Sequence, residues 1–170
     1  MAGRYSEMIQ ENSTWYDKPE VQKGDRGEKI VQNILERLGY ICYKSVSNKS
    51  HPYDFEARKN NIKFYVEVKT KPRRRKYPDT GFNYRHYQIY KRVCEEDNIR
   101  MFICFVDIVQ KMVYGNYLDV LDKDYVDNNC LYPFNESTKQ GELIRYFPLS
   151  VMKPIKNLSE EEIKFLEKTA

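Results

Sequence analysis

Two acidic residues and a lysine have the types and spacing that metal-assisted hydrolysis needs. Glu67 and Lys69 lie two positions apart in the run 62–70 (IKFYVEVKT), whose apolar and β-branched residues predict a strand. Side chains two apart on a strand point to the same face, so a carboxylate and an amine would lie side by side. Burying such charges costs free energy unless they are paired or bind a metal. We therefore expect a functional site on this strand.

A second carboxylate comes from Asp54. Residues 53–58 (YDFEAR) predict another strand, and Asn60-Asn61 would turn the chain so that the two strands run antiparallel. Asp54 would then lie near the end that carries Glu67 and Lys69. Two carboxylates suit Mg²⁺, which takes oxygen ligands and keeps several waters. The lysine could orient a water or stabilise the negative charge that develops on phosphate.

Two alternatives stay open at this point. A solvent-facing ion pair on an edge strand would also place Glu67 and Lys69 two residues apart. The apolar flanks of the pair, the basic loop after it and an early glutamate in the preceding helix favour a functional site. Glu56 lies two residues beyond Asp54 on the same face and is the rival metal ligand; we favour Asp54.

Positive charge is concentrated directly after this strand. The segment 69–76 contains six cations and no acid: Lys69, Lys71, Arg73, Arg74, Arg75 and Lys76. A charge run is usually a solvated loop, but its position beside Lys69 favours a clamp on the phosphates of a nucleic acid. Tyr84 and Arg85, which follow shortly, offer base stacking and phosphate contact near the same site.

Hydrophobic periodicity predicts the elements that must position these residues. The order is a helix, three strands, a helix and two strands, followed by a short edge strand and a closing helix. The expected ranges are 25–38, 40–46, 53–58, 62–70, 83–97, 100–108, 111–121, 142–147 and a last helix from Ser159, where a capping box is expected. We expect the α/β class, with a central mixed β-sheet flanked by helices and an α-β-β-β-α-β core.

Composition limits the class of protein. The 170 residues are 41% hydrophobic and 32% charged, which fits one globular domain, and the net charge of +4 is too mild to prove a nucleic-acid partner. The four cysteines form no C-x-x-C pair, so we expect neither a zinc site nor a disulfide framework. We see no signal peptide and no apolar run long enough to span a bilayer, so we expect no membrane association and a cytoplasmic protein.

The motifs resemble those of a known family. His51-Pro52-Tyr53-Asp54 followed by Glu67-Val68-Lys69 resembles the signature of the PD-(D/E)xK nuclease superfamily, which has the restriction-endonuclease-like fold. The run Gly24-Asp25-Arg26-Gly27-Glu28, which opens a helix, is similar to the first helix of the resolvase-like and the phage or defence-associated branches. The resemblance covers about residues 24–108.

The resemblance implies roles for individual residues. Asp54 and Glu67 would be metal ligands with the Val68 backbone carbonyl, and Lys69 would be the catalytic lysine. Glu28 would support the metal directly or through water. Gln88 and Tyr90 loosely resemble a glutamine followed by an aromatic residue that helps to place substrate in some members. We favour the simpler interpretation that Gln88 is a surface residue and Tyr90 a core residue. The cofactor would be Mg²⁺, with Mn²⁺ as a substitute.

The expected function is metal-dependent hydrolysis of phosphodiester bonds, with DNA as the favoured substrate, by an endonuclease. The alternative is a catalytically inactive module of the same fold that binds nucleic acid or protein. We expect an N-terminal arm at 1–22, a nuclease-like domain at 23–150 and a C-terminal helical extension at 151–170 that packs on the same domain. A homodimer is possible by resemblance.

Overall fold

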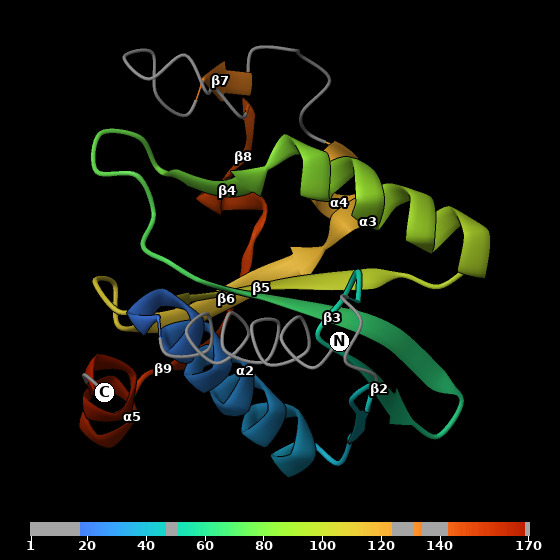
Figure 1. Ribbon diagram of the computed structural model, residues 1–170, viewed down its shortest axis with the longest axis horizontal. Coiled ribbons are helices and arrows are strands. Elements are labelled where there is room, and N and C mark those ends of the chain that lie inside the picture. Colours follow the sequence, from blue (N-terminus) through green and yellow to red (C-terminus); the bar gives the residue numbers. More distant parts are fainter. Residues whose placement is uncertain (1–17, 47–50, 124–130, 134–142, 169–170) are drawn as a thin grey trace, which may run out of the picture.

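The structure is a computed structural model that describes residues 18–46, 51–123, 131–133 and 143–168. Its centre is a six-stranded sheet (Figure 1). Helices α2 (Pro19–Arg37) and α5 (Glu160–Glu167) lie on one face of it, and α3 (Tyr84–Asp97) and α4 (Leu118–Lys123) on the other. This arrangement confirms the predicted α/β class with a central mixed sheet flanked by helices.

The main sheet has the strand order β1-β2-β3-β5-β6-β9. The strands are β1 (Ile41–Tyr43), β2 (Phe55–Lys59), β3 (Ile62–Thr70), β5 (Met101–Asp107), β6 (Met112–Tyr117) and β9 (Lys153–Asn157). The pair β3–β5 is parallel and the other neighbours are antiparallel. The turn between β2 and β3 uses Asn60 in the left-handed region (φ 53°), as the Asn-Asn pair predicts.

A second sheet has the order β4-β8-β7, built from β4 (Asp79–Asn83), β8 (Leu143–Pro148) and β7 (Leu131–Pro133). The strand predicted at 142–147 is therefore confirmed as a strand, but it is the centre of this sheet rather than an edge. Neither β4 nor β7 is among the predicted strands. Strand β4 pairs with residues more than sixty positions away, which local patterns do not reveal, and β7 pairs with residues 10 to 14 positions away. Gly81 permits the pairing, because a Cβ there would lie 1.9 Å from the Arg145 carbonyl oxygen.

The first helix begins earlier than its apolar periodicity predicts. It starts at Pro19, and proline fits the first turn because that position needs no N–H donor. Residues 19–22, which we assigned to the N-terminal arm, therefore belong to α2, and residues 1–17 lie outside the described part. The helix ends as predicted, with Gly39 following at φ 87°.

Two segments near the end of the chain differ from expectation. The predicted strand 111–121 ends at Tyr117 and continues as the short helix α4, which buries Leu118 and Leu121 at helical spacing. The segment 151–170, expected to be helical, also contributes strand β9 to the main sheet. Helix α5 itself is as predicted: Ser159 and Glu162 form a capping box.

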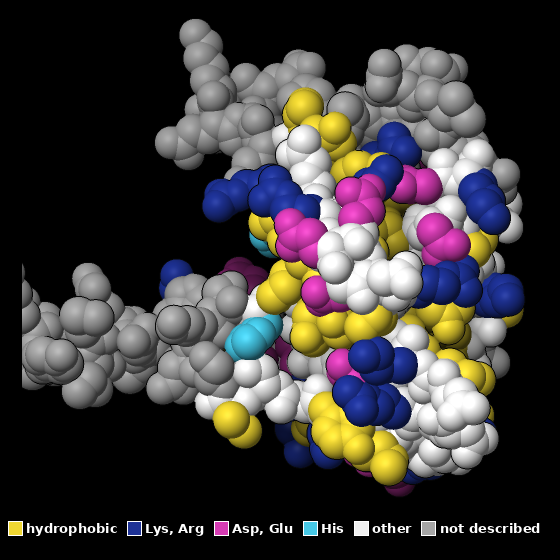
Figure 2. Space-filling view, turned by 90° about the vertical axis from the view of Figure 1, so that its right-hand side faces the viewer, with side chains coloured by type: hydrophobic (Ala, Val, Ile, Leu, Met, Phe, Trp, Pro, Cys, Tyr) yellow, Lys and Arg dark blue, Asp and Glu magenta, His cyan; other side chains and the backbone are white. Residues whose placement is uncertain are grey.

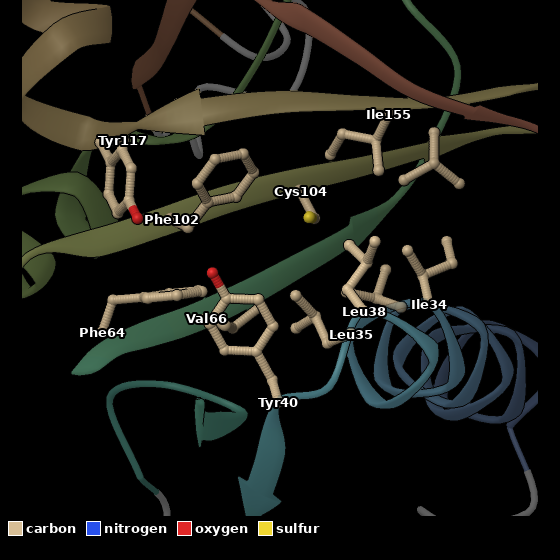
Figure 3. A pocket seen from close by; sticks show the side chains of 12 residues that line it. Ile34, Leu35, Leu38, Tyr40, Phe64, Val66, Phe102, Cys104, Tyr117 and Ile155 are labelled. Atoms are coloured by element: carbon tan, nitrogen blue, oxygen red, sulfur yellow. The ribbon is translucent and has the colours of Figure 1, made fainter. Parts of the chain in front are cut away.

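The two faces of the main sheet bury different sets of side chains. Val66 and Val68 face α2 in an apolar cluster, whereas Tyr65 packs with Tyr90 of α3 on the opposite face. An apolar cavity of about 190 Å³ lies on the α2 face, with the Cys104 thiol in its wall (Figure 3). Glu67 and Lys69 alternate with these valines, so they lie on the other face, away from this cavity. In the described part of the chain, no helix is long and apolar enough to cross a membrane.

Close packing of α2 on β3 gives a testable difference between two glycines. A Cβ at Gly27 would lie 1.8 Å from Thr70 Oγ1, whereas a Cβ at Gly24 would have no heavy atom within 4 Å. We expect Gly27→Ala to lower the free energy of unfolding by about 1–3 kcal/mol through overpacking. Gly24→Ala, on the same helix, should raise it by up to about 1 kcal/mol through helix propensity. Urea denaturation of both variants checks this; equal effects would contradict the close approach of α2 to β3.

Candidate active site

Asp54 is fixed at the end of the β2–β3 pair. It lies one residue before β2, and its backbone N–H donates to the Val66 carbonyl at 3.0 Å, which extends the pairing by one position. Its carboxylate oxygen Oδ2 accepts a hydrogen bond from the Val68 N–H at 2.7 Å. The neighbouring Tyr53 ring stacks on Tyr65 at 3.9 Å between centroids. These contacts hold the Asp54 carboxylate beside Glu67, which is the next position along the strand pairing.

Glu67 and Lys69 form a buried triangle of hydrogen bonds with Tyr90 of α3. Glu67 Oε1 accepts from Lys69 Nζ and from the Tyr90 hydroxyl, both at 2.6 Å, and Lys69 Nζ donates to the Tyr90 oxygen at 2.9 Å. Glu67 is only 7% exposed. The Lys69 ammonium also lies 5.6 Å from the centroid of Phe82. A solvent-facing surface pair, the simpler explanation of the spacing, therefore does not describe these two residues.

A cleft of about 350 Å³ opens over the two carboxylates. Its wall combines Asp54 and Glu67 with the segment just before β2 and with one side of α3. The lining residues are His51, Pro52, Asp54, Glu67, His86, Ile89 and Tyr90. The cleft is large enough for water and a phosphate group, and both carboxylates are accessible from it.

The electrostatics of the cleft are set by two neighbouring carboxylates, of which Glu67 is paired with Lys69. Burial raises the pKa of Asp54 to about 8, and the negative charges of Glu67 and then Glu28 act in the same direction. The Val68 N–H and the Lys69 ammonium oppose this rise without cancelling it. Burial, followed by the charge of Glu67, also raises the pKa of Tyr90, which keeps its hydroxyl protonated. A cation bound between the carboxylates would remove the repulsion.

The donor set fits a hard divalent cation. Asp54 and Glu67 supply carboxylate oxygens, and the Val68 carbonyl is directed to the same side of β3 as the Val68 N–H, which binds Asp54. Mg²⁺ is commonly held by one or two carboxylates and keeps water in its other positions. Within the described residues there is no cluster of three or more His, Cys, Asp or Glu side chains that could hold a metal. A metal here would therefore depend on two carboxylates, a carbonyl and water.

The other two acids lie at the periphery. Glu28 of α2 forms an ion pair with Lys44 at 2.8 Å, and its charge still reaches Asp54. Glu56, the rival of Asp54, pairs with Arg58 and does not line the cleft. Of Asp54 and Glu56, only Asp54 lines the cleft, and the Glu28 carboxylate is paired with Lys44.

The cationic residues of the basic loop fall into two groups: those that are hydrogen-bonded within the protein and those that are exposed to solvent. Lys71 is partly buried, with its Nζ bonded to the Gly81 carbonyl at 2.7 Å, and this burial lowers its pKa. Arg74 binds Asp79 through two nitrogens, with Nε at 2.6 Å from Oδ1. The backbone N–H of Arg73 is tied to the buried Asp107 at 2.8 Å.

Arg75 and Lys76 are exposed at the tip of the loop. They are the predicted phosphate contacts best placed to meet a ligand from solvent. The side of the molecule formed by the β2–β3 turn and the C-terminal end of α3 looks different, because acidic and basic side chains are intermingled there (Figure 2).

Helix α3 carries the residue whose importance the sequence did not reveal. Tyr90 was assigned to the core, and it is buried, but its hydroxyl binds both Glu67 and Lys69. Its position one helical turn after His86, which also lines the cleft, is a weak signal that could have identified it. Gln88 is exposed and is not among the described residues of the cleft wall.

The predicted base-stacking and phosphate contacts on α3 lie at its first turn. Tyr84 is half-buried and stacks on Tyr87 at 5.6 Å between ring centroids. Arg85 is exposed, and its backbone N–H is capped by the Asn83 side chain at 2.8 Å. Arg85 is therefore accessible to a phosphate, whereas the Tyr84 ring is already packed against Tyr87.

Tyr90→Phe tests whether the Tyr90 hydroxyl positions Lys69, because the variant keeps the buried ring and removes only the hydroxyl. Loss of the hydroxyl leaves the Lys69 ammonium with Glu67 alone, so we expect the rate of any metal-dependent cleavage to fall about 10- to 100-fold, in the range of a lost general acid–base or electrostatic contact. The matched control is Tyr87→Phe on the same helix. The Tyr87 hydroxyl donates to Asp122 at 3.0 Å, and neither residue lines the cleft. Single-turnover kinetics of both variants measure this; equal rates for Tyr90→Phe and the wild type would contradict the positioning role.

The fold and the cleft define a mixed α/β protein with a buried Asp–Glu–Lys site. No protein-family model and no curated protein sequence matches the chain. Among solved structures, it is similar to Hjc, a Holliday junction resolvase from the archaeal hyperthermophile Archaeoglobus fulgidus. The two share 12% sequence identity over 76% of this chain and 86% of that chain, with a TM-score of 0.48. A likeness at this level concerns the path of the chain and assigns no role to any residue.

Proposed function

We propose that the protein is a metal-dependent nuclease that hydrolyses phosphodiester bonds, with DNA as the favoured substrate. The observation that supports this most strongly is that Asp54, just before β2, and Glu67, in β3, line one cleft, and that the Lys69 ammonium is hydrogen-bonded to Glu67 beside it. The resemblance to PD-(D/E)xK nucleases rests on the same residues.

Asp54 and Glu67, with the Val68 carbonyl, would hold Mg²⁺ or Mn²⁺. When bound, such an ion supplies Lewis-acid stabilisation of phosphate charge and lowers the pKa of bound water. The raised pKa of Asp54 supports this assignment, because a buried carboxylate beside another carboxylate is stabilised by a cation. Glu28 would act from further away, through its charge.

Lys69 is the residue of this chain that would act on the reacting groups. Its ammonium carries three donors, of which Glu67 and the Tyr90 oxygen occupy two. The third can hold the attacking water or donate to a phosphate oxygen as negative charge develops there. Tyr90 and Glu67 together fix the position of the ammonium, so that little reorganisation is needed when substrate arrives.

A nucleic-acid substrate is supported by exposed cations on two segments of the protein. Arg75 and Lys76 are exposed on the loop after β3, and Arg85 is exposed at the first turn of α3. Cations in such positions neutralise backbone phosphates whatever the base sequence, and they make the affinity depend on salt. Whether two copies act together as a homodimer stays a prediction.

The proposal is tested by incubating the purified protein with end-labelled plasmid, single-stranded, flap and four-way-junction DNA and with RNA. Each substrate is tried with Mg²⁺, with Mn²⁺ and with a chelator. We expect cleavage of at least one DNA form that requires the metal. Failure to cut any DNA or RNA form in either metal would overturn the proposal.

A second function, an inactive module that binds nucleic acid or protein, is favoured by one observation. Glu67 already has two donors, Lys69 and Tyr90, and so has partners without any metal. Calorimetry separates the two functions. Salt-sensitive DNA binding without Mg²⁺ or Mn²⁺ binding would favour the module, whereas metal binding that is lost in Glu67→Gln would favour the nuclease.

A further inference from the structure

An exposed tyrosine stands in the basic loop between β3 and β4. Tyr77 is 53% exposed, although tyrosine rings are normally more buried. One part of its ring is covered by the guanidinium of Arg74, whose central carbon lies 4.4 Å from the ring centroid. About half of the tyrosine surface remains open to solvent.

The support beneath this ring is rigid. The Arg74 guanidinium binds the Asp79 carboxylate through Nε and a second nitrogen, and it lies 3.8 Å from the centroid of Tyr146 in β8. The Arg74 backbone N–H also donates to the Asp79 carbonyl at 2.9 Å. Tyr77 therefore rests on a side chain that is itself fixed by an ion pair and by a second aromatic ring.

The backbone of the loop is held as well. The Arg73 side chain donates to the Tyr77 carbonyl at 3.4 Å, and the Arg73 N–H is bonded to the buried Asp107 at the end of β5. Little conformational entropy is left to lose when a flat ligand covers Tyr77. Arg75 and Lys76, both exposed, come directly before it in sequence.

We propose that Tyr77 is a stacking platform for an unpaired base of a DNA strand, with Arg75 and Lys76 contacting its phosphates. This deepens the proposed nuclease function by naming the class of substrate, a DNA that carries a single-stranded segment. A fixed, solvent-facing aromatic ring beside backbone-binding cations is what sequence-independent single-strand binding uses. A base inside a duplex has both faces covered by its neighbours and does not offer one to the ring.

The charge of the loop argues for a nucleic acid over an acidic peptide or an apolar partner. Asp79, the acid beside the platform, is neutralised by Arg74, so the surface next to Tyr77 is cationic. An apolar protein partner would leave Arg75 and Lys76 desolvated without a counter-charge, which costs free energy. An unpaired DNA strand satisfies the ring and the cations together.

The experiment measures the affinity of the full chain for an oligo-deoxythymidine and for a blunt duplex of equal length, by fluorescence anisotropy in a chelator. We expect Tyr77→Ala to weaken single-strand binding about tenfold, as for one lost base stack, and to change duplex binding little. Tyr77→Phe should bind like the wild type. Tyr43→Ala removes a tyrosine of similar exposure, 50%, from edge strand β1 and should have no effect.

Two further variants test the base stacking and the phosphate contacts separately. Tyr77→Leu keeps apolar contact with Arg74 but lacks an aromatic face, so it should lose binding as Tyr77→Ala does even if the alanine variant is less stable. Lys76→Ala should weaken single-strand and duplex binding alike and reduce the salt slope by about one phosphate contact. Tyr77→Ala should leave that slope unchanged.

Unchanged single-strand binding in Tyr77→Ala and Tyr77→Leu would overturn the proposal, and so would an equal loss on the duplex. An oligo-uridine arm tests the choice of DNA: a loss confined to RNA would overturn it. Because these measurements need no metal and no turnover, they remain informative if the protein cuts nothing. The platform and the nuclease activity can therefore fail separately.

Discussion

Lys69→Met is expected to reduce metal-dependent DNA cleavage at least about 100-fold while leaving the protein folded. The variant keeps the length and the apolar stem of the side chain but lacks the ammonium that binds Glu67 and Tyr90. Loss of one charge-stabilising donor at a reacting phosphate has an effect of about this size. The measurement is single-turnover cleavage of whichever DNA form the wild type cuts.

The matched control is Lys63→Met, on the same strand β3 but exposed near the β2–β3 turn. It should cleave at the wild-type rate. If Lys69→Met cleaves as fast as Lys63→Met, then the ammonium does not take part in the reaction, whatever its contacts.

Asp54→Asn should have two opposite effects. Without metal it should stabilise the protein near pH 8, by about 1–3 kcal/mol, because it removes a buried charge that faces Glu67 and keeps an oxygen for the Val68 N–H. With Mg²⁺ or Mn²⁺ it should abolish the stabilisation that metal gives the wild type. Thermal denaturation in a chelator and in metal measures both effects.

The pH dependence follows from the direction of the shift. The pKa of Asp54 is about 8 in the folded protein, above its usual value of 3.8, so the folded state binds more protons between these values. The contribution of this group to stability therefore falls as the pH rises from about 4 to about 8. Asp54→Asn should flatten that part of the curve, and metal affinity of the wild type should rise with pH over the same range. A pH-independent difference between the two proteins would contradict this.

Local patterns predicted the elements that carry the site. Alternation in the run 62–70 gave β3 with its observed bounds, and the helix predicted at 83–97 is α3. The predicted turn at Asn60-Asn61 placed Asp54 near the end of the strand pair that carries Glu67, and the observed register does place Asp54 beside Glu67. These features are encoded within short segments, so the sequence alone was sufficient.

Long-range pairings could not be predicted in the same way. Strand β4 exists because it pairs with β8, some sixty residues later; Pro78, just before it, and Gly81, within it, look locally like loop residues. Arg74 looked like a free phosphate contact because its partner Asp79 becomes its neighbour only when the loop folds back. The role of Tyr90 likewise depends on how α3 packs over β3, which periodicity does not fix.

The most direct test of the central claim compares the wild type with the triple variant Asp54→Ala/Glu67→Ala/Lys69→Ala on one end-labelled DNA panel in Mn²⁺. Circular dichroism first establishes that both proteins are folded. We expect the wild type to cut at least one DNA form and the triple variant to cut none. Equal cutting by both proteins, or no cutting by the wild type, would contradict the assignment of this cleft as a nuclease active site.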